Sequence, residues 1–233
     1  MTGTPERIRV LIADDQPLVR RGLALILAPH PAFEVVAEAD NGQQAVDLAH
    51  RHRPHVVVMD IRMPVLDGVQ ATERLTRELP ACRVLALSTF DMDEYVVAAL
   101  RAGASGFLPK DVSPEELSAA VRTVHTGEAA VAPRLLTRLI STYVTAPRLP
   151  PAPVPLPASS LGELTPREIE VWYLLATGLD NAEIASAMGI SVSTVKNYIT
   201  SIFAKLSVRD RAQAVIAAYE SGLVEARPAN PAG

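Results

Sequence analysis

The chain has 233 residues, a formal net charge of -4 and a single cysteine, Cys82. This length is sufficient for two domains with separate hydrophobic cores. Because the overall charge is not basic, a nucleic-acid role must rest on a local group of basic residues. One cysteine excludes an intramolecular disulfide framework and fits a reducing compartment.

The N-terminal segment 1–9 is polar and has no signal-like apolar stretch, and no uncharged run approaches the length of a membrane span. We therefore expect a cytoplasmic protein without a membrane partner. The five histidines lack the paired spacing of metal ligands, which argues against a zinc site.

From residue 7 to about 127, apolar runs alternate with segments of helical periodicity. This alternation predicts a parallel sheet covered by helices on both faces. Five strands alternating with five helices favour the order 2-1-3-4-5, in which the first and third strands are neighbours. The predicted strands are 7–13, 33–38, 55–60, 82–88 and 105–109, and the predicted helices are 17–28, 42–52, 67–78, 92–103 and 113–127.

Two of these strands end in acidic residues. The apolar run 56–59 leads to Asp60, and the run 8–13 leads to Asp14 and Asp15. If the two strands are neighbours, three carboxylates meet at the carboxyl edge of the sheet, where open α/β sheets bind ligands. Carboxylates this close need a cation, and oxygen ligands around a small hard cation indicate a Mg²⁺ site that serves phosphate chemistry. Taken singly, each acid is better explained as a helix cap or a solvated turn residue, but the combination of three argues against that explanation.

Two further polar groups follow strands at the same edge. The fourth strand ends in Ser88, and the fifth is followed by Lys110. A hydroxyl and an ammonium beside a metal site supply the hydrogen-bond donor and the counter-charge that an added phosphoryl group requires. The expected chemistry is attack of the Asp60 carboxylate on phosphorus, which gives an acyl phosphate.

Residues 7–127 resemble the receiver domain of two-component response regulators. The motifs that carry the resemblance are Ile12-Ala13-Asp14-Asp15, Met59-Asp60-Ile61-Arg62-Met63-Pro64 with Asp67-Gly68, Ala86-Leu87-Ser88-Thr89, and Ala102-Gly103-Ala104-Ser105-Gly106-Phe107 with Lys110. The resemblance implies a flavodoxin-like fold and makes Asp60 the phosphoacceptor.

The resemblance also assigns the remaining residues of the site. It implies that Asp14, Asp15, Asp60 and the backbone carbonyl of Arg62 bind Mg²⁺. Ser88 and Lys110 would sense the phosphoryl group, and Phe107 would occupy the aromatic switch position. Gln16 stands where the family often has histidine, and Pro109 precedes Lys110; neither departure removes a reacting group.

The sequence changes character after Gly127. Residues 133–140 have the apolar stripe of a connector helix, and 146–157 contain six prolines. A proline-rich stretch favours a semi-rigid spacer, and a ligand for a proline-recognising module is the alternative. We therefore predict a receiver domain at 1–127, a connector helix and linker at 128–160, a DNA-binding domain at 161–225 and a flexible tail at 226–233.

Residues 161–225 predict a small all-α domain. Thr165 caps a helix that ends near Thr177, Asp180 caps a second helix that ends near Met188, and Ser191 caps a third helix after a turn at Gly189. Two helices joined by a tight glycine turn form a helix-turn-helix. The residues of the first helix expected to pack inward are Ile169, Val171, Trp172 and Leu175.

The third helix has two distinct faces. The residues expected to pack inward are Val195, Ile199, Ile202, Phe203 and Leu206, and those expected to face outward are Ser193, Asn197, Thr200, Ser201 and Ala204, with Lys196 on the flank. Small polar side chains suit entry into the DNA major groove. The alternative is an ordinary solvated helix in a small bundle, because 161–225 carry more acid than base. However, most of the acids precede the turn, and the basic residues that cluster after it are Lys196, Lys205, Arg209 and Arg211.

The same residues resemble the LuxR-type helix-turn-helix of the NarL/FixJ class of regulators. The motifs are Leu164-Thr165-Pro166-Arg167-Glu168, Gly178-Leu179-Asp180-Asn181-Ala182-Glu183-Ile184-Ala185, Ser193-Thr194-Val195-Lys196, and Lys205-Leu206 with Arg209-Asp210-Arg211. The departure is Asn197-Tyr198, where the family often has histidine at the second position.

This second resemblance implies roles in DNA binding and dimerisation. The residues it places at the groove are Lys196, Asn197 and Thr200 together with Ser193 and Thr194, and those it places at the DNA backbone are Lys205, Arg209 and Arg211. The final helix, 210–221, resembles the dimerisation helix, with Ala214, Val215, Ala217 and Ala218 as its small-residue face. A homodimer on an inverted-repeat or tandem site is implied.

The sequence thus indicates a DNA-binding transcriptional response regulator rather than an enzyme. A partner histidine kinase is expected to phosphorylate Asp60, because the chain has neither a nucleotide-binding loop nor a donor-histidine domain. Phosphorylation would control dimerisation and binding to double-stranded promoter DNA, with RNA polymerase as a further candidate partner. One alternative is a phosphorylation-independent regulator with a receiver-like interaction domain. The other is a Mg²⁺-dependent phosphohydrolase, although Arg62 stands where some such enzymes have a general acid.

Overall fold

A computed structural model describes residues 7–88, 93–128, 130 and 163–224. The chain divides into two compact units, Met1–Ala130 and Val131–Gly233. The connector helix predicted at 133–140, the proline-rich linker and the tail predicted at 226–233 lie outside the described residues.

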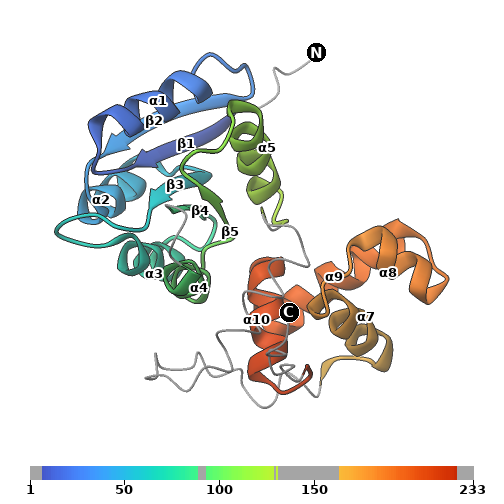
Figure 1. Cartoon of the computed structure of the whole chain (residues 1–233). Helices are drawn as coiled ribbons and strands as arrows, with labels where there is room; N and C mark the ends of the chain where they lie inside the picture. Colours follow the sequence, from blue (N-terminus) through green and yellow to red (C-terminus); the bar gives the residue numbers. More distant parts are fainter. Residues whose placement is uncertain (1–6, 89–92, 129, 131–162, 225–233) are drawn as a thin grey trace, which may run out of the picture. The chain divides into compact units, whose positions relative to one another are not determined.

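The N-terminal unit is built on a five-stranded parallel sheet with the order β2-β1-β3-β4-β5, which confirms the predicted fold class (Figure 1). The strands are β1 (Ile8–Ala13), β2 (Phe33–Ala39), β3 (Val56–Asp60), β4 (Arg83–Ser88) and β5 (Gly106–Pro109). Every residue of β3 is buried, as expected for the central strand of a sheet covered on both faces.

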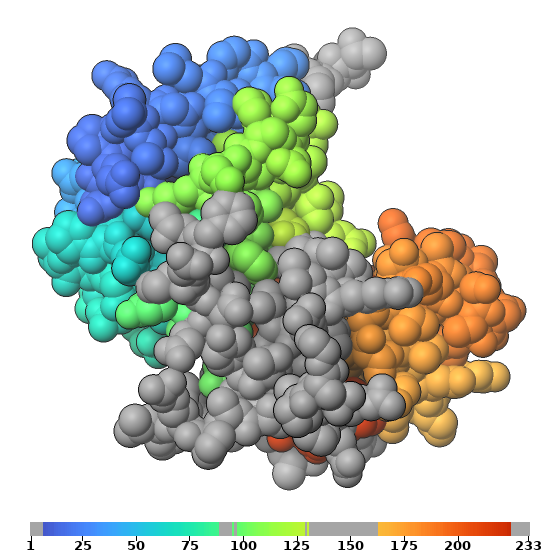
Figure 2. Space-filling view, viewed as in Figure 1, coloured from blue at the N-terminus to red at the C-terminus, as the bar shows by residue number. Residues whose placement is uncertain are grey.

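Helices cover both faces of this sheet. They are α1 (Pro17–Leu27), α2 (Gly42–His52), α3 (Gly68–Glu78), α4 (Asp93–Arg101) and α5 (Pro114–His125). Alternate residues of β1 enter opposite cores: Val10 packs with residues of α1 and α5, and Leu11 packs with residues of α2 and α3. α1 and α5 pack on the same face of the sheet, and their surfaces, blue and yellow-green, lie side by side in the space-filling view (Figure 2).

The C-terminal unit contains α7 (Pro166–Ala176), α8 (Asn181–Met188), α9 (Val192–Leu206) and α10 (Arg211–Glu220). Capping boxes start α7 at Thr165 and α8 at Asp180, and Gly189 ends α8 with a positive φ of 65°. Because glycine adopts this conformation without steric cost, the chain turns directly into α9. The predicted helix-turn-helix is therefore confirmed.

Two packing predictions for this unit are wrong. Ile169 is 37% exposed, whereas Glu168 is 4% exposed and occupies the buried stripe of α7. Ser201 does not face away from the unit, because its hydroxyl donates to Glu168 Oε1 at 2.6 Å. Helical periodicity placed Ser201 on the polar face, and a charged partner on α7 draws it inward. Trp172 is buried as predicted and donates from Nε1 to the carbonyl of Ala214 at 2.8 Å.

Candidate functional site

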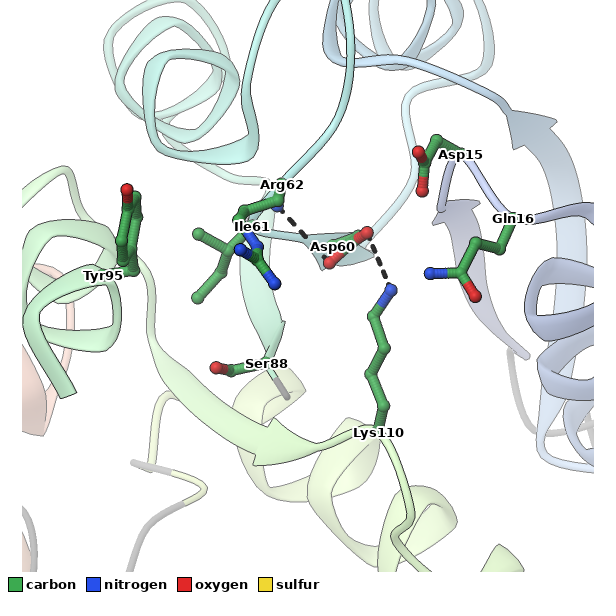
Figure 3. A pocket seen from close by; sticks show the side chains of 8 residues that line it. All are labelled: Asp15, Gln16, Asp60, Ile61, Arg62, Ser88, Tyr95 and Lys110. Carbon is green, nitrogen blue, oxygen red and sulfur yellow. Dashed lines mark hydrogen bonds and ion pairs between the residues drawn. The ribbon is translucent and has the colours of Figure 1, made fainter. Parts of the chain in front are cut away.

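The carboxyl edge of the sheet holds a pocket of about 240 Å³ (Figure 3). The pocket is lined by Asp15, Gln16, Asp60, Ile61, Arg62, Ser88, Tyr95 and Lys110. The strand order places the ends of β1, β3, β4 and β5 next to one another. The structure therefore brings together residues that the sequence places at strand ends up to about a hundred positions apart.

Asp60 ends β3 at the floor of the pocket, and its side chain is 6% exposed. The start of α3 packs tightly beneath it, since a Cβ on Gly68 would lie 2.0 Å from the carbonyl oxygen of Asp60. The backbone N–H of Arg62 is directed at Asp60 Oδ1 across 3.4 Å. Asp60 is thus held by its own backbone surroundings while its carboxylate faces the pocket.

Three carboxylates meet at this position. Asp14 is fully buried, with Oδ1 accepting a hydrogen bond from the backbone N–H of Gln16 at 2.9 Å, whereas Asp15 is exposed. One oxygen from each of Asp14, Asp15 and Asp60 lies within 4.8 Å of the others. Three carboxylate oxygens in so small a space, one of them open to solvent, fit a hard divalent cation such as Mg²⁺ that keeps part of its water shell.

Lys110 places its ammonium between two of these carboxylates. Its Nζ lies 2.8 Å from Asp14 Oδ2 and 2.7 Å from Asp60 Oδ2. The backbone N–H of Lys110 donates to the carbonyl of Ser88 at 2.9 Å, which ties it to the end of β4. Pro109 pairs with Ser88 in the sheet, and an edge strand such as β5 tolerates proline because its outer side needs no ladder bond.

The pKa directions show how this charge is distributed. Burial raises the pKa of Asp60, and the charge of Asp14 adds to the rise, against the opposing hydrogen bond and charge of Lys110. Burial by itself would lower the pKa of Lys110, but the hydrogen bonds and charges of Asp14 and Asp60 outweigh it and raise that pKa. Two buried carboxylates thus share one ammonium, and the site keeps an excess of negative charge.

Of the predicted switch residues Ser88 and Phe107, only Ser88 lines the pocket. Ser88 is buried and lines the pocket, whereas Phe107 is half-buried on β5 and is not among the lining residues. Tyr95, from α4, also lines the pocket, with 44% exposure, and is not among the residues predicted from the sequence. It does not lie at a strand end, and nothing in its spacing distinguishes it from a surface residue of a helix.

The exposed face of α9 carries most of the residues predicted to enter a DNA groove. Ser193, Lys196, Asn197 and Thr200 are exposed, and Thr194 is half-buried. The hydroxyl of Thr200 donates to the carbonyl of Lys196 at 3.0 Å, within its own helix. The amide of Asn197 and the ammonium of Lys196 are both open to solvent at neighbouring positions of α9.

The residues predicted to contact the DNA backbone have internal partners. Lys205 Nζ lies 2.7 and 2.9 Å from the two oxygens of Glu168. Arg211 is 5% exposed and donates to the carbonyl of Leu179 and, at 3.2 Å, to Asn181 Oδ1. Arg209 is half-buried. Phosphate contacts by these three residues stay predictions.

The predicted dimerisation face of α10 is not open to solvent. Its four residues are between 0% and 4% exposed: Ala214, Val215, Ala217 and Ala218. Dimerisation through these side chains stays a prediction, and it requires that they be uncovered.

Glu168 links the start of α7 to α9. Its Oε2 accepts from the backbone N–H of Thr165 at 2.7 Å and from the Thr165 hydroxyl at 2.8 Å. The ammonium of Lys205, the hydroxyl of Ser201 and the backbone of Thr165 lower the pKa of Glu168 to about 2. Glu168 is therefore ionised at every ordinary pH and is saturated with donors.

Together, the parallel sheet with a carboxylate-lysine pocket and the helix-turn-helix define a receiver-type domain joined to a DNA-binding domain. Residues 10–122 match the response regulator receiver domain, and residues 162–218 match the bacterial regulatory proteins of the luxR family. The chain belongs to the response regulators that combine these two domains, and it is a DNA-binding transcription regulator of two-component type.

Relatives match this chain over nearly their whole length. The chain is 41% identical over 216 residues to the transcriptional regulatory protein LnrK of Bacillus subtilis, covering 93% of this chain and 98% of LnrK. It is 36% identical over 218 residues to the response regulator VraR of Staphylococcus aureus, covering 94% and 99%.

Solved structures agree with this assignment. The response regulator ChrA of a heme-sensing two-component system matches with a TM-score of 0.50 and 35% identity, over 94% of this chain and 99% of ChrA. The receiver domain of NarL from Mycobacterium tuberculosis matches with a TM-score of 0.51 and 41% identity, over 53% of this chain and 99% of that domain. Within the described residues, no helix is both long and apolar enough to cross a membrane.

Proposed function

We propose that this regulator is switched by phosphorylation of Asp60, with a partner histidine kinase as the phosphoryl donor. The observation that carries the proposal is the Lys110 ammonium, which lies 2.7 Å from the Asp60 carboxylate and 2.8 Å from that of Asp14. A nucleophilic carboxylate, a fixed cation and a neighbouring acid pair are the parts that phosphoryl transfer onto aspartate requires.

In the proposed reaction, a carboxylate oxygen of Asp60 attacks the phosphorus of a phosphohistidine. The phosphorus–nitrogen bond breaks, the histidine leaves with the bonding pair, and an acyl phosphate remains on Asp60. Asp14, Asp15, Asp60 and the carbonyl of Arg62 would hold Mg²⁺, which when bound neutralises charge on the transferred phosphoryl oxygens.

The remaining pocket residues act on the product. Lys110 keeps its ammonium beside the added negative charge, and the buried Ser88 hydroxyl donates to a phosphoryl oxygen. Movement of Ser88 toward the phosphoryl group frees space for Phe107 to repack, so that a local charge alters the surface of the receiver domain. Ser88 supports this role by lining the pocket. Phe107 supports it by its place on β5, where it pairs with Ala86, two residues before Ser88 on β4.

The output of the switch is promoter binding by α9. Asn197 and the flanking Lys196 are exposed on α9, where an amide and an ammonium can reach base edges in the major groove of double-stranded DNA. Phosphorylation would favour a homodimer whose two α9 helices bind paired half-sites and present the promoter to RNA polymerase. The α10 residues predicted to form the dimer contact would become accessible in this active form.

The proposal is tested by phosphorylation of the purified full-length chain. Wild type, Asp60→Ala and Asp60→Asn are incubated with Mg²⁺ and a small-molecule phosphodonor, and intact mass and solution size are followed together. Wild type is expected to gain one phosphoryl group and to shift toward a dimer, whereas both Asp60 variants stay unmodified. Asp111→Asn is the matched control, because Asp111 is exposed beside Lys110 and does not line the pocket.

Undiminished labelling of the Asp60 variants would refute the assignment of the phosphoacceptor. Continuous release of inorganic phosphate from small phosphate esters would indicate a phosphohydrolase instead. DNA selected from a random-sequence pool completes the test: equal affinity of wild type and Asp60→Asn for this DNA under phosphorylating conditions would show that DNA binding does not depend on the phosphoryl group.

A further inference from the structure

Arg20, on α1, holds the loop that carries two of the three pocket carboxylates. Its NH1 donates to the backbone carbonyl of Asp14 at 2.6 Å. Its Nε lies 3.6 Å from Glu38 Oε2 on β2, and the Arg20 side chain is only 18% exposed. The guanidinium therefore ties the loop between β1 and α1 to the neighbouring strand.

The polar atoms of Asp14 each have a separate partner. The backbone N–H donates to the carbonyl of Ala39 at 3.1 Å, Oδ1 accepts from Gln16, and Oδ2 pairs with Lys110. The backbone carbonyl is bound by Arg20. Because the peptide group is planar, the direction of this carbonyl also sets the direction in which the chain leaves Asp14 toward Asp15.

We propose that Arg20 is a positioning residue for the divalent-cation site: it fixes the Asp14–Asp15 peptide and thereby directs the exposed Asp15 carboxylate toward Asp14 and Asp60. This inference rests on the proposed cation site of the receiver domain and adds a residue that touches neither the cation nor the phosphoryl group. Partners that orient metal ligands from behind are energetically important, and their loss commonly costs about 10- to 100-fold in metal affinity.

Charge and position make opposite predictions for Arg20. A guanidinium near a cation site repels the cation, so removing its charge alone should tighten cation binding. If Arg20 acts by holding the peptide, its removal should weaken binding. The sign of the change in affinity thus separates the two effects.

Arg21 supplies the matched control. It carries the same charge at the next position of α1 and reaches Glu38 Oε1 at 3.9 Å, but its side chain is 78% exposed. Substitution of Arg21 removes an equal charge from the same carboxylate and leaves the bond between Arg20 and Asp14 in place.

The experiment is calorimetric titration of the unphosphorylated full-length chain with Mn²⁺ and with Mg²⁺. Arg20→Met keeps the apolar stem and removes the guanidinium, and it is expected to weaken cation binding by about 10-fold or more. Arg20→Lys is expected to recover only part of the affinity. A single ammonium cannot contact both the backbone carbonyl of Asp14 and the Glu38 carboxylate in the geometry of the planar guanidinium. Arg21→Met is expected to bind as wild type or slightly more tightly.

A second readout needs no metal. In metal-free buffer, the amide resonances of Asp15 and Gln16 are expected to shift in Arg20→Met and Arg20→Lys and to stay in place in Arg21→Met. Circular dichroism establishes that each variant is folded. If Arg20→Met does not fold, Arg20→Lys carries the test through both readouts.

The outcomes distinguish this inference from the proposed function. Wild-type or tighter cation binding by a folded Arg20 variant would overturn the positioning role, as would an equal loss in Arg21→Met. If wild type itself bound neither cation, the proposed cation site would fail and this inference with it. Cation binding that is lost in Asp15→Asn but unchanged in Arg20→Met would leave the site intact and overturn the role of Arg20 alone.

Discussion

Each of the two units contains a close lysine–carboxylate ion pair, and the two pairs have different roles. Lys110 Nζ lies 2.7 Å from Asp60 in the receiver domain, and Lys205 Nζ lies 2.7 Å from Glu168 in the DNA-binding domain. The pKa of Asp60 is nevertheless raised, whereas that of Glu168 is lowered to about 2. The distance between the charges therefore does not decide what the pair does.

The neighbours of each pair explain the difference. Asp60 is buried and shares its lysine with Asp14, so two carboxylates compete for one ammonium. Within the part of the chain that the structure describes, Glu168 is the one carboxylate that pairs with Lys205, and it accepts further hydrogen bonds from Ser201 and Thr165. The Asp60 carboxylate has too little positive charge around it, so an added cation would stabilise it, and it remains available to react. The Glu168 carboxylate already has a full set of donors, so its role is to hold two helices together.

Removal of Lys110 should give the largest effect. In Lys110→Met the two buried acids lose their shared cation, and the rate of phosphorylation by a small-molecule donor is expected to fall by about 100-fold or more. Intact-mass spectrometry over time measures the rate. Lys196→Met is the matched control, since it makes the same change on α9 and should be labelled at the wild-type rate. A wild-type rate in Lys110→Met would show that this ammonium takes no part in the transfer.

In the DNA-binding domain, Glu168→Gln should lower the free energy of unfolding by about 2 kcal/mol, because it leaves the Lys205 ammonium without its carboxylate. Trp172, the single tryptophan of the chain, is 1% exposed in this unit, so its fluorescence during urea unfolding reports on this domain. The control is Glu170→Gln, whose pair with Arg167 at 2.8 Å is exposed and should contribute less than about 0.5 kcal/mol. Equal losses in the two variants would mean that burial adds nothing to the Glu168 pair.

In the receiver domain, neutralising a buried carboxylate should raise the stability instead of lowering it. Asp14→Asn keeps an oxygen for the Gln16 amide and leaves Lys110 paired with Asp60 alone, as Lys205 is with Glu168. In metal-free buffer this relief of repulsion should stabilise the domain by about 1 kcal/mol, while Mg²⁺ affinity is lost. Hydrogen exchange of the Val56–Asp60 amides measures the stability. A loss of stability without metal would contradict the account of an overcharged site.

The meeting of the strand-end residues in the receiver domain could be predicted from the sequence because it follows from the strand order. Once β1 and β3 are neighbours, Asp14, Asp15 and Asp60 must meet, and the positions of Ser88 and Lys110 follow from the same rule. Tyr95 could not be predicted in this way, because it reaches the pocket from a helix. Its contribution depends on how α4 packs, which strand-end reasoning does not address.

The errors in the DNA-binding domain have one common cause. The capping box at Thr165 and Glu168 was visible in the sequence, but the second role of Glu168 depends on Ser201 and Lys205, more than thirty residues away. Helical periodicity treats a charged residue as exposed, so it assigned Ile169 to the core and Ser201 to the surface. A buried ion pair between two helices becomes visible only when their packing is known.

Lowering the pH should change the stabilities of the two domains in opposite directions through Glu168 and Asp60. The pKa of Glu168 in the folded chain is about 2, below its ordinary value of 4.5, so the unfolded state binds this proton first as the pH falls. The stabilisation from Glu168 is therefore complete above about pH 4.5 and is lost as the pH falls toward 2. For Asp60 the sign is reversed, because its raised pKa makes the folded receiver domain take up the proton more readily than the unfolded chain.

Trp172 fluorescence during urea unfolding should show this acid dependence in the DNA-binding domain. The wild-type domain should lose stability between about pH 4.5 and 2, and Glu168→Gln, which already lacks the carboxylate, should lose less. An identical acid dependence in wild type and Glu168→Gln would show that other carboxylates control the acid response of this domain.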